Sequence, residues 1–249
     1  MILNENKKGE LTTKQLVVII ILIASFIIVL FLLFRLNLGE TSAKEICHNS
    51  VVLRGKSGGL AGHLDCRINY LCISGGEDCK GISATSTIKV DPDGEEFKNE
   101  TMKAIADEMS DCWWMFGEEK INYAGGDLPK KTACSICSIV EFDEKLKKSP
   151  MISYQEFYDY LRTTPKTSSQ TYLQYLYSTN ALDDIEKDFP VEDYITNNLE
   201  FGKTYFILTG MSKSIVWGLF GSEHLPVVIL EKTQENYDKI RCDIFLTKS

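Results

Sequence analysis

The chain has 249 residues, of which 44% are hydrophobic, and 27 basic against 35 acidic side chains give a net charge of −8. This length fits one domain or two small ones, and this hydrophobic content excludes a disordered chain. All eight cysteines follow a single apolar run near the N-terminus. That arrangement argues against both a multi-span transporter and an ordinary cytosolic protein.

The apolar run begins at Leu16 and ends at Phe34, and 18 of its 19 residues are apolar, with Ser25 as the exception. As a helix it would be about 28 Å long, close to the hydrocarbon thickness of a bilayer. A cleaved signal peptide usually has a shorter apolar core. We therefore expect an uncleaved transmembrane helix over residues 16–35, with the lipid bilayer as its partner.

The charges that flank this run indicate its orientation. Lys7, Lys8 and Lys14 precede it, whereas Arg35 and Lys44 follow it, so the positive-inside bias is small. The cysteines favour the same orientation, because disulfides form outside the cytoplasm. We expect a cytoplasmic tail over residues 1–15, a stalk over residues 36–45 and an extracytoplasmic domain over residues 46–249, in the cell membrane with a single span.

The residues Lys7-Lys8-Gly9-Glu10 before the run resemble a class III, prepilin-type signal, in which a peptidase cuts after the glycine. This resemblance implies a pilin-like subunit whose apolar helix packs into a filament. The chain has Lys14 where that family often has glutamate, and a basic tail in front of an anchor explains the same residues.

The rest of the chain alternates between strand-like and helix-like patterns. Apolar and β-branched segments bounded by glycines predict early strands at residues 51–53, 64–73 and 83–90, followed by a turn at residues 91–94. Apolar residues at spacings of three and four predict a long helix over residues 95–116, with Glu108 on one of its polar faces. A strand over residues 134–142, helices over residues 153–162 and from 169 or 171 to 177, and strands over residues 203–209, 226–231 and 239–246 complete the order. We expect one α+β domain with a mainly antiparallel sheet, a long helix and no repeated βαβ alternation.

An even number of cysteines on one side of the anchor predicts disulfides, and four bridges allow 105 connectivities. We expect one cluster of Cys47, Cys66, Cys72 and Cys79 in the first strand region. The remaining four would tie the long helix to neighbouring strands, and they are Cys112, Cys134, Cys137 and Cys242.

The motif Cys134-Ser135-Ile136-Cys137 has three interpretations: structural disulfides, a zinc site, or a thiol–disulfide oxidoreductase that uses Cys134 and Cys137. The apolar residues around the motif indicate a strand rather than the helix N-terminus that activates a redox cysteine. No second CxxC supplies further zinc ligands, so we expect no metal, no cofactor and no catalytic residue.

Two other features suggest contacts at the surface. Asn99-Glu100-Thr101 is an N-glycosylation sequon on the expected outer side. Trp113 and Trp114 are adjacent, so on a helix they point about 100° apart. Core packing explains both tryptophans most simply, and a recognition surface for a protein partner at the cell surface is the alternative.

Residues 36–249 carry 23 basic and 33 acidic side chains, a net charge of −10, which disfavours nucleic-acid binding. The segment from Cys112 to Glu118, followed by the CxxC motif, resembles uncharacterised archaeal single-pass membrane proteins with a cysteine-bearing external domain. That resemblance implies architecture and location, and it transfers no catalytic residue. The sequence thus predicts a membrane-anchored extracytoplasmic structural or binding module, with a pilin-like subunit and a thiol–disulfide enzyme as alternatives.

Overall fold

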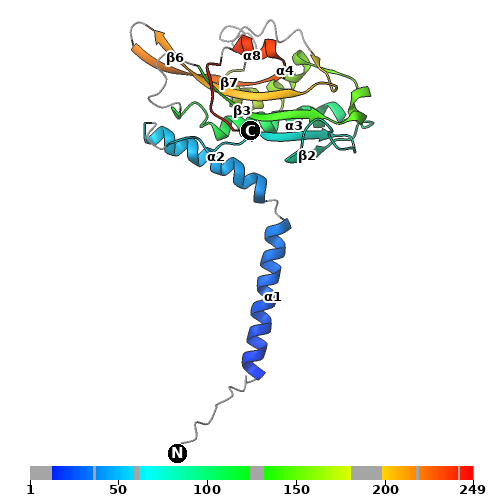
Figure 1. The fold of residues 1–249 in the computed structure, drawn as a ribbon. Coiled ribbons are helices and arrows are strands. Elements are labelled where there is room, and N and C mark those ends of the chain that lie inside the picture. Colours follow the sequence, from blue (N-terminus) through cyan, green and yellow to red (C-terminus); the bar gives the residue numbers. More distant parts are fainter. Residues whose placement is uncertain are drawn as a thin grey trace, which may run out of the picture. The chain divides into compact units, whose positions relative to one another are not determined.

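A computed structural model gives the fold of the chain (Figure 1). It describes residues 13–35, 38–58, 62–123, 132–180, 198–216, 219–240 and 242–248, with side chains throughout except at residues 13–14, 32–35, 38–42 and 213–223. The chain divides into two compact units, Met1–Ser42 and Ala43–Ser249, and each is described by itself.

The N-terminal unit contains helix α1, Thr13–Arg35, which covers the apolar run. Its described large apolar side chains, from Leu16 to Phe31, are exposed, with fractions between 36% and 63%. Among the described residues, no helix combines the length and the hydropathy that are needed to cross a membrane.

The C-terminal unit is built on a six-stranded sheet with the strand order β2-β1-β3-β6-β7, in which β8 also pairs with β3. The strands are β1 Asn69–Ser74, β2 Ser86–Lys89, β3 Ala133–Phe142, β6 Tyr205–Val216, β7 Leu219–Glu231 and β8 Ile244–Phe245. A separate antiparallel pair joins β4, Ile152–Ser153, to β5, Asn198–Leu199. The α+β class that we expected is therefore confirmed.

The six-stranded sheet contains both parallel and antiparallel strand pairs, so it is mixed rather than mainly antiparallel as we expected. Strand β1 is parallel to both β2 and β3, and β8 is parallel to β3, whereas β3–β6 and β6–β7 are antiparallel. Helix α3, Phe97–Met115, connects β2 to β3, so the chain contains one βαβ unit that we did not expect. Strands β1 and β2 are parallel neighbours although their connection is short, whereas parallel neighbours usually need a longer one.

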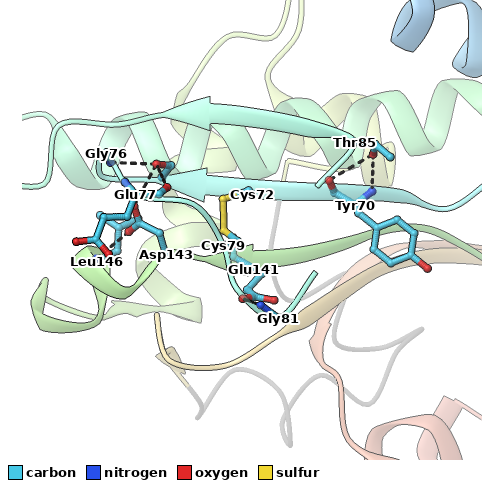
Figure 2. The surroundings of a disulfide bond; sticks show 11 residues. Tyr70, Cys72, Gly76, Glu77, Cys79, Gly81, Thr85, Glu141, Asp143 and Leu146 are labelled. Carbon is cyan, nitrogen blue, oxygen red and sulfur yellow. Dashed lines mark hydrogen bonds between the residues drawn. A yellow bond between two sulfur atoms is a disulfide. The ribbon is translucent and has the colours of Figure 1, made fainter. Parts of the chain in front are cut away.

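A disulfide holds the short return between β1 and β2 (Figure 2). Cys72 in β1 is bonded to Cys79 in the connection, and the amide of Gly81 donates to Oε1 of Glu141 at 2.8 Å. The buried carboxylate of Asp143 accepts hydrogen bonds from the Ser74 hydroxyl and from backbone amides. These contacts hold the connection against the sheet without a helix.

Helices and loops cover both faces of the sheet. The larger core packs apolar side chains of α3, α4 (Tyr154–Thr163) and α5 (Tyr172–Tyr177) against one face. A smaller core on the other face contains Phe206, Leu208, Val228 and Leu230, and side chains of helix α8 (Gln234–Ile240) pack against it. A short 3-10 helix, Glu144–Lys148, follows β3.

Three expected elements match the structure closely. The long helix expected at residues 95–116 is α3, and the helices expected near residues 153 and 171 are α4 and α5. The Ser153 hydroxyl accepts from the amide of Glu156, and Thr171 with Gln174 forms a full capping box. Each cap satisfies amides that a helix leaves without a partner in its first turn.

One expected strand is helical instead, and another is helical only at its start. Residues 51–53 lie in α2, Leu38–Lys56, which also includes residues 38–45 of the expected stalk. Cys47 and Val51, one turn apart, are both buried, whereas Leu53 is 61% exposed. Packing of that helical face therefore overrides the local β-propensity. Of the strand expected at residues 239–246, the first two residues belong to α8, and only Ile244–Phe245 pairs as a strand.

Candidate functional site

The four disulfides include all eight cysteines and leave none free. They join Cys47 to Cys66, Cys72 to Cys79, Cys112 to Cys137, and Cys134 to Cys242. The pairs stay within the two groups of four that we expected. However, Cys47 lies in helix α2 rather than in a strand region, and of the second group only the Cys112–Cys137 bridge ties α3 to β3.

The two cysteines of the CxxC motif belong to different disulfides. Cys137 is bonded to α3, whereas Cys134 is bonded to Cys242 beside β8. A redox motif needs its two sulfurs to bond with each other, and a zinc site needs free thiolates. This pairing fits the structural interpretation of the motif.

A break in strand register explains how Cys137 reaches the helix. Ile136 pairs with Leu208 and Ser138 pairs with Ile207, so Cys137 is an extra residue in a β-bulge. Its disulfide and the Ser138 hydroxyl both contact α3. The bulge therefore places two consecutive side chains on the helix, which regular alternation along a strand would not do.

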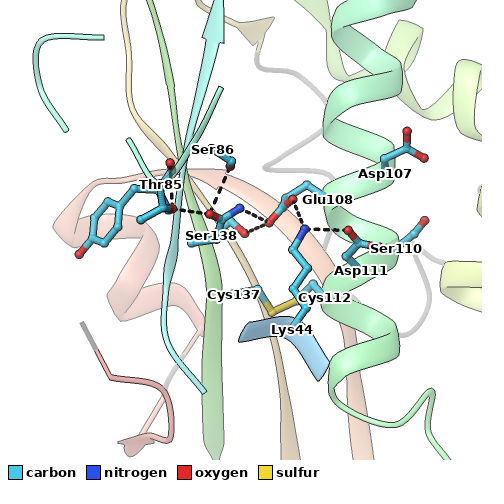
Figure 3. Close-up of polar contacts among 12 residues, drawn as sticks. Lys44, Thr85, Ser86, Asp107, Glu108, Ser110, Asp111, Cys112, Cys137 and Ser138 are labelled. Carbon is cyan, nitrogen blue, oxygen red and sulfur yellow. Dashed lines mark hydrogen bonds and ion pairs between the residues drawn. A yellow bond between two sulfur atoms is a disulfide. The ribbon is translucent and has the colours of Figure 1, made fainter. Parts of the chain in front are cut away.

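Ser138 belongs to a polar cluster centred on Glu108, which we call the Glu108 network (Figure 3). Glu108 lies on α3 and is only 4% exposed. Its Oε2 atom lies 3.0 Å from Nζ of Lys44, and its Oε1 atom accepts from Asn69 Nδ2 at 2.9 Å and from the Ser138 hydroxyl. The carboxylate therefore joins α2, α3, β1 and β3.

The network extends to strand β2 and to the surface. The hydroxyls of Thr85 and Ser86 donate to Oδ1 of Asn69 at 2.5 and 3.2 Å. Lys44 also contacts Oδ2 of Asp111 at 2.8 Å, and the Asp111 side chain is 43% exposed. Burial alone would lower the pKa of Lys44, but the charges of Glu108 and Asp111 outweigh it and hold that pKa above its usual value.

We expected Glu108 on a polar face of the long helix, and this expectation was wrong. Glu108 follows Ile105 by three residues and precedes Cys112 by four, and both of those residues are fully buried. That spacing puts all three on one helical face. The helical period therefore carried a signal for a buried carboxylate, but nothing local indicated that Lys44, 64 residues earlier, would neutralise it.

Two tyrosines fix other carboxylates of this region. The hydroxyl of Tyr172 donates to Asp107 at 2.6 Å, and that of Tyr175 donates to Glu118 at 2.6 Å. Burial, followed by these carboxylates, raises the pKa of both tyrosines. The two bonds hold α5 against α3 and its C-terminal turn, and they keep both phenols protonated.

The two tryptophans have different environments. Trp113 is 4% exposed and belongs to the larger core, so it does not contribute to a recognition surface. Trp114 is half-buried, and its ring stacks on His48 with a centroid distance of 4.2 Å. Nδ1 of His48 lies 2.8 Å from the Trp114 carbonyl oxygen, so this stack joins α2 to α3.

The sequon residue Asn99 lies in the first turns of α3 and is exposed, with its amide donating to Glu96 at 2.7 Å. Thr101 of the sequon is fully buried, and its hydroxyl has no hydrogen-bond partner. Glycosylation of Asn99 stays a prediction, and in the folded unit Thr101 is shielded from an enzyme.

These residues therefore stabilise the fold by linking helices to one another and to the sheet. Within the ranges that the structure describes, no three His, Cys, Asp or Glu side chains are grouped to hold a metal ion. No family model, no curated protein and no solved structure matches the chain.

Proposed function

We propose that the protein is a membrane-anchored extracytoplasmic structural or binding module, stabilised by disulfides. The observation that carries this proposal is that all eight cysteines follow the apolar run and all are paired. Disulfides persist in oxidising compartments and are rare in the cytosol. The paired cysteines therefore support our proposal that the unit containing them lies outside, with the N-terminal tail in the cytoplasm.

The anchor in this proposal is the apolar run from Leu16 to Phe34. It contains no charge and no proline, and the structure describes it as part of helix α1. Its described apolar side chains are exposed, and lipid is the solvent that suits such a surface.

A protein at the cell surface is the partner that we propose for the outer unit. The net charge of −10 on residues 36–249 disfavours nucleic acid and favours an approaching cationic surface. Four disulfides and the Glu108 network hold the fold, and a rigid fold loses little entropy when it binds. The enzyme alternative has less support, because Cys134 and Cys137 have other bonding partners.

Topology and cysteine state can be measured together on the full chain in cells. We expect the protein to stay in the membrane after alkaline extraction and its C-terminal unit to be digested by protease added outside. A maleimide reagent should label its cysteines only after reduction. Reversing the charges of Lys7, Lys8 and Lys14 should weaken the orientation, and substituting Lys145, Lys147 and Lys148 in the same way is the matched control. Extraction in alkali, or full labelling without reduction, would refute the proposal.

A further inference from the structure

Helix α3 contains a buried hydroxyl, that of Thr101, which contributes no hydrogen bond to the described part of the fold. Thr101 is 0% exposed, and its Oγ1 atom has no partner among the described residues. Ser110 on the same helix is also buried, but its hydroxyl donates to the Ala106 carbonyl at 2.8 Å. A buried hydroxyl without a partner costs free energy, so the hydroxyl of Thr101 destabilises the folded chain.

The position of Thr101 suits an apolar side chain. Phe97 and Ile105, one turn before it and one turn after it, are both buried in the larger core. This spacing puts the three residues on one face of α3. Valine has the branched shape of threonine without the hydroxyl, so packing alone does not explain why this position carries a threonine.

The hydroxyl of Thr101 has a use outside the fold, because it completes the sequon Asn99-Glu100-Thr101. The sequence contains no other Asn-X-Ser or Asn-X-Thr triplet. The transferase that attaches N-linked glycans recognises the hydroxyl two residues after the asparagine. In the folded unit Asn99 and Glu100 are exposed, whereas Thr101 is buried. The acceptor therefore stays at the surface, while the group that the transferase must recognise is out of its reach.

We propose that Asn99 is N-glycosylated before α3 packs against the sheet, and that the Thr101 hydroxyl serves this reaction. The inference rests on the proposed function, because the reaction takes place outside the cytoplasm. The larger core also contains Ile207 of β6 and Ile229 of β7, so it cannot close over Thr101 until those strands have joined the sheet. Afterwards the glycan projects from the exposed side of α3, where the Asn99 amide otherwise donates to Glu96.

The donor in this reaction is an oligosaccharide that is linked through phosphate to a membrane lipid. Nδ2 of Asn99 forms a bond to the anomeric carbon of the first sugar, and the bond from that carbon to the phosphate oxygen breaks. The lipid phosphate leaves with the electron pair, and the amide nitrogen gives one of its two protons to a base of the transferase. The proposed anchor holds the chain in the membrane that carries this donor.

Substitutions at Thr101 separate a role in the reaction from a role in the fold. Thr101→Val keeps the shape of the side chain and removes the hydroxyl, whereas Thr101→Ser keeps the hydroxyl and removes a buried methyl group. Asn99→Gln removes the acceptor and is the control for the position of the glycan. Each full chain is produced in the cells that make the protein, and the glycan is measured as added mass on the peptide that contains residue 99. Melting temperatures are measured on chains from a host that lacks the transferase.

We expect a glycan on the native chain and on Thr101→Ser, and none on Thr101→Val or Asn99→Gln. Without glycan, Thr101→Val should melt at or above the temperature of the native chain, because it removes a hydroxyl that has no partner. Thr101→Ser should melt below that temperature, because it leaves a cavity. A glycan on Thr101→Val, or a melting temperature of that variant below the native one, overturns the assignment of the hydroxyl to the reaction.

The order of glycosylation and folding is tested on the purified full chain without glycan. Membranes that contain the transferase and its lipid-linked donor should glycosylate the reduced and unfolded chain and leave the folded chain unmodified. Equal modification of both chains, or of neither, overturns the inference. A native chain that carries no glycan, although external protease digests its C-terminal unit, also overturns the inference and leaves the proposed function standing. A C-terminal unit that lies in the cytoplasm refutes both.

Discussion

Removing the carboxylate at the centre of the Glu108 network should destabilise the fold strongly, because Glu108 lies on the buried face of α3. In Glu108→Ala, Lys44, Asn69 and Ser138 each lose an acceptor, and a cavity remains between α3 and the sheet. Breaking a buried ion pair from one side typically costs about 3–5 kcal/mol. Lys44 keeps Asp111 as a partner and its side chain is 17% exposed, so we expect about 3 kcal/mol.

Asp111→Ala is the matched control, because Asp111 contacts the same lysine from the same helix. Its side chain is 43% exposed, and exposed ion pairs are worth about 0–1 kcal/mol. The free energy of unfolding can be measured by urea titration of the full chain in detergent micelles, followed by tryptophan fluorescence. A loss below about 1 kcal/mol for Glu108→Ala, or equal losses in the two variants, would refute the reasoning.

A double-mutant cycle isolates the contact itself. Lys44→Met should cost less in the Glu108→Ala background than in the native chain, because the lysine has already lost its buried partner.

The pair of Lys44 and Glu108 should also make the free energy of unfolding depend on pH. The pKa of Lys44 is raised in the folded state, so its contribution is complete below the unfolded value of about 10.4 and falls as the pH rises above it. Additive single losses, or a native unfolding free energy that is flat above this pH, would contradict the assignment.

Three further predictions concern other parts of the C-terminal unit. Replacing Cys134 and Cys242 by serine should lower the free energy of unfolding by up to about 4–5 kcal/mol, because their disulfide closes the longest loop. Replacing Cys72 and Cys79, which are only seven residues apart, should cost about 2 kcal/mol, and chemical unfolding without reductant measures both losses. Gly210→Ala should cost about 1–3 kcal/mol, because its Cβ would lie 2.6 Å from a backbone oxygen of β3, whereas Gly202→Ala, with open space, should change stability by less than about 0.5 kcal/mol. Burial lowers the pKa of His224, so the unfolded chain binds a proton at this side chain more readily than the folded chain does. The free energy of unfolding should therefore fall as the pH drops below about 6.5, and His224→Gln should remove this pH dependence.

Periodicity in the sequence predicts the elements that depend on local contacts. Met102, Ile105 and Met109 predict α3, and all three are buried in the larger core. Ser153 and Thr171 predict the starts of α4 and α5 because capping is a contact between residues three apart. The grouping of cysteines also follows from local reasoning, since the first four precede α3.

Contacts between distant segments could not be predicted in this way. The parallel pairing of β1 with β2 depends on a connection held by the Cys72–Cys79 disulfide and by the hydrogen bond from the Gly81 amide to Glu141, 60 residues later. The helical state of residues 51–53 depends on core contacts of Cys47 and Val51. The neutralisation of Glu108 depends on Lys44, which local sequence places in a polar stalk.

The interlocked disulfides have a consequence for how the chain is made. Three of the bridges close loops that follow one another along the sequence, so each can form as soon as its second cysteine has emerged. The fourth forms last, because Cys134, which lies inside the loop that Cys112 and Cys137 close, has its partner 108 residues later. At about 5–20 residues per second, Cys134 must stay unpaired for about 5–20 s beside a neighbour that has already been oxidised. During synthesis Cys134 is therefore open to pairing with a wrong cysteine, an error of the kind that disulfide isomerases correct.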